Sequence, residues 1–136
     1  MTRSRPAVGP LQKAPQPPGH LSQTAKQVWK RACAYLLNRQ LLHSADVSAL
    51  EAFCMAVAGL RRIEAEMEGV PLFDDAGKPH AGLRAAEVTS GTIAKLAAQL
   101  LLAPASRGRL PVAQQRGAKQ AEGEDDWLAV LPGGKK

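Results

Sequence analysis

Three segments of this chain repeat their apolar residues with the period of an α-helix, and this pattern restricts the chain to a mainly helical fold. In residues 21–42 the repeating side chains are Leu21, Ala25, Val28, Trp29, Ala32, Tyr35 and Leu36. In residues 43–69 they are Leu50, Phe53, Val57, Leu60 and Met67, and in residues 81–102 they are Leu83, Ala86, Ile93, Leu96, Ala97 and Leu100. We therefore predict a helical hairpin followed by a long third helix.

The expected helix ends carry capping residues. Ser22 is an N-cap candidate for the first helix, because its hydroxyl can accept a first-turn N–H. Ser44 can cap the second helix, with Asp46 in a first turn where the helix dipole favours an acid. Gly69 is a plausible C-cap. Gly91 is unfavourable inside the third helix by about 1 kcal/mol relative to Ala, so we expect either a kink or a tight backbone contact there.

The segment between the second and third helices predicts a short β-hairpin. Apolar residues at 70–73 precede a turn-rich tetrapeptide at 74–77. The flanking Pro71 and Pro79 would keep the hairpin at an edge, and we expect it to pack on the helices or on another subunit. Asp74 and Asp75 are interpreted as turn formers rather than as a pair of metal ligands.

The two ends of the chain differ in composition from the core, which we place at residues 21–110. Residues 1–20 hold five of the ten prolines, which predicts a disordered basic arm. Residues 111–136 predict a flexible tail with an acidic and apolar peptide that orders on a partner; the alternative is a tail that packs on its own domain. The residues expected to dock are Asp125, Asp126, Trp127, Leu128 and Leu131.

The net charge of +6 and the pI of about 9.8 favour a polyanionic partner. The aromatic content of 4% argues against a stacking platform for single strands. No run of 18 apolar residues occurs, so no membrane partner is predicted. Cys33 and Cys54 lie in apolar helical patterns and are expected to be reduced core residues of a cytosolic protein; a disulfide between neighbouring helices is the alternative.

Motifs for catalysis are missing from the sequence. It contains no GxxxxGK[ST] loop and no GxSxG elbow. His20, His43 and His80 have no His or Cys partner at i+3 or i+4, so no metal or cofactor is predicted. The chain is therefore not expected to be an enzyme. Its third helix is apolar on nearly all sides from Ile93 to Leu102, which favours self-association. A ring or another homo-oligomer would cover this apolar surface.

Four stretches of the sequence carry a resemblance to a known family. They are residues 17–62, with the start LLHSADVSAL of the second helix, residues 77–86 (GKPHAGLRAA), residues 96–110 (LAAQLLLAPASRGRL) and residues 124–131 (EDDWLAVL). In their order and motifs they resemble the small terminase subunits of tailed bacteriophages, in the mainly helical family with a hairpin between the second and third helices.

The resemblance implies a non-enzymatic role in viral genome packaging. Proteins of this family form rings, recognise viral DNA at its packaging start site, and recruit and stimulate the large subunit that supplies the ATPase motor and the nuclease. The implied partners are double-stranded viral DNA, the terminase large subunit and further copies of the same chain. The implied location is the host cell cytoplasm, outside the mature virion.

Basic side chains are the candidates for contacts with DNA phosphates. They are Lys26, Lys30, Arg31, Arg39, Arg61, Arg62, Arg84, Lys95, Arg107 and Arg109. For Arg107 and Arg109 the favoured interpretation is structural, in which they hold a subunit seam. Two other classes of protein remain as alternatives: a helix-turn-helix DNA-binding regulator, and a structural phage adaptor or head-completion ring protein.

Overall fold

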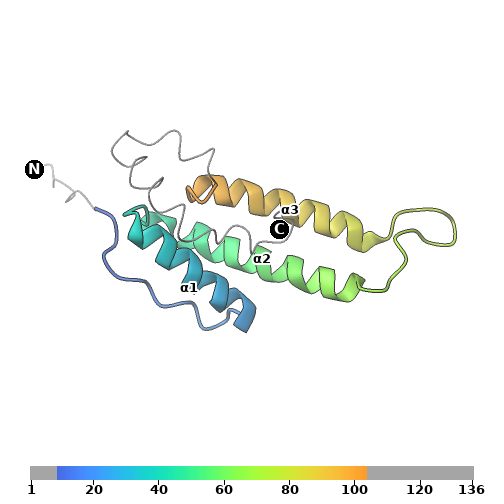
Figure 1. Cartoon of the computed structure of the whole chain (residues 1–136), viewed down its shortest axis with the longest axis horizontal. Helices are drawn as coiled ribbons and strands as arrows, with labels where there is room; N and C mark the ends of the chain where they lie inside the picture. Colours follow the sequence, from blue (N-terminus) through green and yellow to red (C-terminus); the bar gives the residue numbers. More distant parts are fainter. Residues whose placement is uncertain (1–8, 104–136) are drawn as a thin grey trace, which may run out of the picture.

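The computed structural model describes residues 9–103, in which three long helices lie side by side (Figure 1). They are α1 (Gln23–Asn38), α2 (Val47–Met67) and α3 (Ala81–Gln99), with a short 3₁₀ helix, η1 (Ser44–Asp46), between the first two. Each long helix runs antiparallel to the one before it, and α2 lies in the middle (Figure 1). The predicted mainly helical fold is confirmed, with a helical hairpin and a long third helix.

The ends of α1 show one predicted and one unpredicted signal. Ser22 caps its N-terminus as predicted, because the Ser22 hydroxyl accepts the Ala25 N–H at 3.2 Å. At the other end Gln40 has a left-handed backbone, with φ of 55°. Its N–H bonds the Leu37 carbonyl, and the Leu41 N–H bonds the Leu36 carbonyl. This is a Schellman motif with glutamine at a position that usually holds glycine.

The strained Gln40 gives a first prediction. Gln40→Gly is expected to raise the free energy of unfolding by about 1 kcal/mol, because glycine adopts φ > 0 without a Cβ penalty. The same substitution at exposed Gln27, inside α1, should lower it by about the same amount. Urea unfolding of both variants at one protein concentration measures the two effects, and a loss of stability at both sites would contradict the motif.

The ends of η1 and α2 differ in part from expectation. Asp46, rather than Ser44, makes the cap: its carboxylate accepts the His43 backbone N–H at 3.1 Å. The prediction for Ser44 is wrong because the first turn is 3₁₀ and begins after His43. Gly69 ends α2 much as predicted, one residue beyond the C-cap Glu68 and with φ of 73°.

The hydrophobic core lies between α1, the first half of α2 and the end of α3. Its fully buried large side chains are Trp29, Cys33, Leu36, Leu42, Leu50, Phe53, Cys54, Val57 and Leu102. From residue 61 to residue 92 no residue is buried. We call residues 61–92 the distal arm; it projects beyond the start of α1 (Figure 1).

The α2–α3 loop (residues 68–80) does not form the predicted pair of β-strands. Its only bridge is an isolated antiparallel one between Phe73 and Pro79, and no strand occurs in residues 9–103. On either side of this bridge the Asp74 N–H donates to the Lys78 carbonyl and the His80 N–H to the Leu72 carbonyl, both at 2.8 Å. The loop extends past the ends of both helices with no described element beside it to continue the pairing (Figure 1). Asp74 does act as a turn former, since its carboxylate accepts the Ala76 and Lys78 N–H groups at 2.9 and 2.8 Å.

The N-terminal segment also differs from expectation. Disorder was predicted for residues 1–20, yet residues 9–20, here called the strap, lie along α1 (Figure 1). The Trp29 indole N–H donates to the Pro15 carbonyl at 3.0 Å, and the Leu11 N–H donates to the Leu42 carbonyl at 2.7 Å. A buried tryptophan needs an acceptor for its N–H, and the strap supplies it.

Helix α3 runs unbroken through Gly91. Thr89 and Thr92 bond back to the carbonyls of the preceding turn, at Ala85 and Val88. A Cβ built on Gly91 would meet no atom within 4 Å. Neither the expected kink nor a tight contact within the chain therefore explains this glycine.

Candidate nucleic-acid interface

The net positive charge of the protein lies mainly in its first third, because that part has no acids. Residues 1–45 contain seven Lys or Arg and no Asp or Glu, and the first acid in the chain is Asp46. Among the described residues, 9–45 carry five basic side chains and no acid, whereas 46–103 carry five basic and eight acidic ones. Because 9–45 form the strap and α1, and 46–103 form mainly α2 and α3, the molecule has a positive layer beside a negative one.

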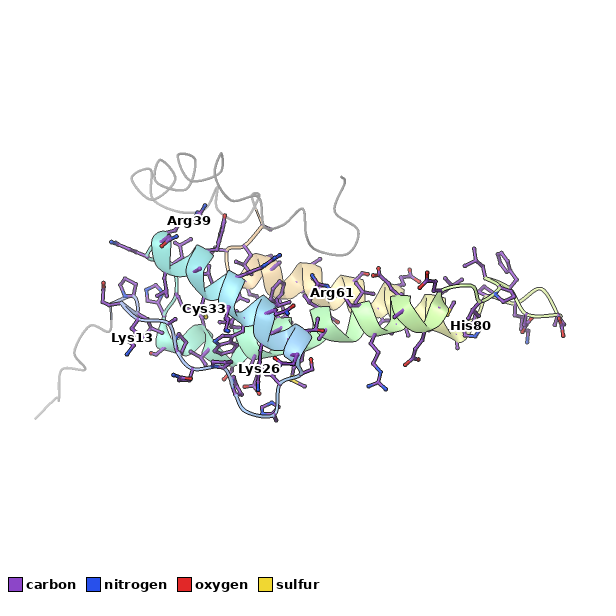
Figure 2. The ribbon with its side chains drawn as sticks, turned by 60° about the horizontal axis from the view of Figure 1, so that its bottom comes forward. Lys13, Lys26, Cys33, Arg39, Arg61 and His80 are labelled. Atoms are coloured by element: carbon purple, nitrogen blue, oxygen red, sulfur yellow. The ribbon has the colours of Figure 1, made fainter. Side chains whose placement is uncertain are left out.

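The exposed cations of the positive layer lie on two neighbouring segments. Lys30 and Arg31 are exposed on α1, Lys26 lies one turn before Lys30 and is half-buried, and Lys13 is exposed on the strap. Lys30 borders a surface groove that α1 forms with strap residues 14–17. Figure 2 shows Lys13 on the strap and Lys26 near the start of α1. We call Lys13, Lys26, Lys30 and Arg31 the basic surface.

The strap is fixed at several points, which gives Lys13 a defined place. Besides the two hydrogen bonds from Leu11 and Trp29, its last residue, His20, pairs with Glu51 of α2 at 2.7 Å. The candidate residues that the sequence predicted did not include Lys13. The signal that would have found it is the complete absence of acids before Asp46.

Arg39 has a different environment from the other cations of α1. Its guanidinium stacks on the Tyr35 ring, 3.5 Å from the centroid, and donates to the Tyr35 carbonyl at 3.0 Å. Its Nε and one terminal nitrogen are buried. This geometry suits a side chain that packs over the end of α1.

The candidates on α2 and α3 lie among acids. Arg62 pairs with Glu66 one turn along, at 3.2 Å, and Arg84 lines a surface hollow together with Glu87. Arg61 is half-buried, and Lys95 is exposed on α3. These four cations therefore belong to the layer that carries the acids, although Arg62 also borders a groove with Ser22 and Ala25 at the start of α1.

The histidines and cysteines have structural surroundings. His80 caps α3 by accepting the Gly82 N–H on Nδ1 at 3.0 Å, and it lies at the far end of the distal arm (Figure 2). Cys33 and Cys54 are free and buried, and burial raises their pKa values to about 11 and about 12, which suppresses the reactive thiolate. Within residues 9–103 no cluster of three His, Cys, Asp or Glu side chains could hold a metal ion.

The remaining predicted residues, Arg107, Arg109 and the docking peptide at 125–131, lie outside the described part of the chain. In the described part, none of the helices has the length and apolar character that crossing a bilayer requires.

Comparison with known proteins assigns the family. The model of a family described as phage terminase, small subunit, matches residues 25–117, which is more than half of the chain. The chain belongs to the phage terminase small subunit family. Comparisons with curated proteins and with solved structures found no match.

Membership of the terminase small subunit family assigns the chain to phage genome packaging. The matched region begins inside α1 and contains α2 and α3 in full. The strap precedes it and the acidic and apolar peptide follows it. Lys13 on the strap and the residues from 125 to 131 therefore lie outside the matched region.

Proposed function

We propose that this protein is the non-catalytic small subunit of a viral DNA-packaging terminase, which binds viral DNA at the packaging start site and delivers it to the large ATPase and nuclease subunit in the host cytoplasm. The observation that carries the proposal is the acid-free layer formed by the strap and α1 in a member of this family. A surface with cations and no acids attracts a polyanion without local repulsion.

The proposed contact with DNA is electrostatic. Lys13, Lys26, Lys30 and Arg31 would neutralise phosphates and release the counterions condensed on the duplex. Such contacts position a protein on DNA and carry no sequence information themselves. Discrimination of the start site would then rest mainly on the shape and deformability of the DNA.

The second part of the proposal is assembly into a ring. The distal arm supports it, because a pair of helices without a buried residue gains little from its own packing. Four large apolar side chains are also more than half exposed: Met55, Leu72, Phe73 and Val88. Contacts between copies would cover part of this surface.

The third part is recruitment of the large subunit through residues 122–136. The full chain is expected to bind duplex DNA and to stimulate the ATPase of the large subunit, whereas a chain ending at residue 121 should bind DNA normally and stimulate little. Duplex binding and ATP turnover, measured on both chains, check this. If the shortened chain stimulates fully, the docking role of the tail is wrong; if the full chain neither binds nor stimulates, the proposed function is wrong.

A further inference from the structure

Gly59 is not explained by the fold of a single chain. It lies inside α2, where glycine is less favourable than alanine by about 1 kcal/mol. A Cβ built at this position would meet no atom within 4 Å. Gly82, in contrast, has a reason within the chain, because a Cβ there would collide with the Met67 sulfur. The open space over Gly59 is therefore available to something outside the chain.

That space is a surface groove between the start of α1 and the middle of α2. Its walls are apolar, with Leu21 and Ala25 on one side and Met55 and Ala58 on the other. The groove offers about 280 Å³, many times the ~30 Å³ that one water molecule occupies in the liquid. Met55 is 51% exposed here, so the groove leaves a large apolar side chain uncovered.

A second uncovered apolar feature lies at the end of the distal arm. Leu72 and Phe73, the loop tip, are 55% and 58% exposed, and every residue from 71 to 80 is exposed. The loop projects beyond the ends of α2 and α3 (Figure 1). No described part of the same chain covers the loop tip.

The chemistry of the loop tip matches that of the groove. Two apolar side chains are followed by the exposed Asp75, whereas the apolar groove has His20 and Arg62 among its lining residues. Arg62 is paired only with Glu66 in an exposed helix pair, and such pairs contribute little to stability. If Arg62 changed its partner from Glu66 to an acid of another molecule, the cost in free energy would therefore be small.

The loop tip cannot reach the groove of its own chain. From Gly59 to Met67 the rigid α2 extends by about 12 Å at 1.5 Å per residue, and the loop continues away from the groove. Within residues 9–103 no other segment fills the groove, and the loop tip is the apolar and acidic projection of this part of the chain. We propose that Leu72 and Phe73 of one copy dock in the groove over Gly59 of the next copy.

This inference rests on the proposed ring and specifies its contact. The loop tip and the groove are different surfaces, so the contact is heterologous and each copy gives a tip to one neighbour and a groove to the other. Heterologous contacts close into rings when the rotation between copies permits it. In this contact a side chain at position 59 would occupy the space of the neighbour's tip, which gives a reason for glycine there.

Two variants of the full chain each block one side of the contact. Leu72→Ser with Phe73→Ser removes the tip, and because both side chains are exposed the fold is retained. Gly59→Leu fills the groove and replaces a helix-destabilising glycine. In native mass measurements each variant alone is expected to run at the single-chain mass of 14.4 kDa. Gly91→Leu is the matched control, the same substitution at an open site on α3, and should retain the wild-type mass.

Mixing the two blocked variants gives the decisive measurement. The intact groove of one and the intact tip of the other should form a two-chain species that grows no further. The inference is overturned if either blocked variant keeps the wild-type mass, or if the mixture stays single-chain. Those outcomes leave the proposed ring standing on another interface, whereas a wild-type protein that is single-chain at all concentrations would overturn the ring itself.

Discussion

Replacing Lys26, Lys30 and Arg31 together with glutamine is expected to weaken binding to duplex DNA on the order of 100-fold at 0.15 M salt. Each phosphate contact contributes about −0.9 to the slope of log K against the logarithm of the salt concentration. If the contribution of these contacts to binding falls to zero near 1 M salt, three contacts account for a loss of affinity of this size at 0.15 M salt. The slope itself should become less steep by about 3. Equilibrium binding measured at several salt concentrations gives both numbers.

The chain offers a matched control for net charge. Lys78, Arg84 and Lys95 are exposed cations in residues 46–103, the part that carries the acids, and their triple change to glutamine removes the same three charges. We expect that variant to bind DNA with an affinity and a salt slope close to those of the wild type. Equal weakening in both triple variants would show that only the total charge matters, and the basic surface would then have no special role.

The separation of these two sets of cations was not visible in the helical pattern. Periodicity places Lys30 on α1 and Arg62 on α2, but it cannot say which helix forms an outer layer or where the acids lie around each cation. The structure resolves this because α2 is central and α1 carries no acid. The run from residue 1 to residue 45 without Asp or Glu was nevertheless readable in the sequence, and it points to the same surface.

Local sequence signals predicted the start of α1 and the end of α2. The Ser22 cap and the left-handed Gly69 both follow from a residue type and its neighbours within one turn. The position of residues 9–20 along α1 could not be predicted from neighbouring residues, because it depends on a hydrogen bond between Pro15 and the Trp29 indole, fourteen residues away. The left-handed residue at the end of α1 was not predicted, because Gln40 has a backbone conformation that sequence patterns associate with glycine.

The β-hairpin was overpredicted for a related reason. Alternating apolar residues around a turn favour paired strands, and the turn itself formed around Asp74 as expected. Stable strands also need a surface to pack on, and the loop has no neighbouring element among residues 9–103 beyond its single bridge. The same lack of a neighbour makes the loop tip a candidate for contact with another copy.

Substitutions of the two phenylalanines should affect different properties of the protein: Phe53→Ala its folding, and Phe73→Ala its assembly. Phe53 is completely buried in the core, and Phe53→Ala is expected to cost 3–5 kcal/mol, from lost burial and from the cavity left behind. Since small domains have only about 5–15 kcal/mol of stability, much of the protein should unfold. Phe73→Ala makes the same chemical change at a side chain that is 58% exposed, and should change the free energy of unfolding by less than about 0.5 kcal/mol.

Urea unfolding at low protein concentration measures both variants without a contribution from assembly, which would otherwise raise the apparent stability. At high protein concentration, Phe73→Ala should have the larger effect on oligomer mass and Phe53→Ala the smaller, when only folded protein is compared. The folded fraction of Phe53→Ala keeps its tip and its groove and still associates, whereas Phe73→Ala stays folded and dissociates. Comparable losses of stability in the two variants would mean that the loop packs on its own chain, and the exposed tip would then not be free to dock on a neighbour.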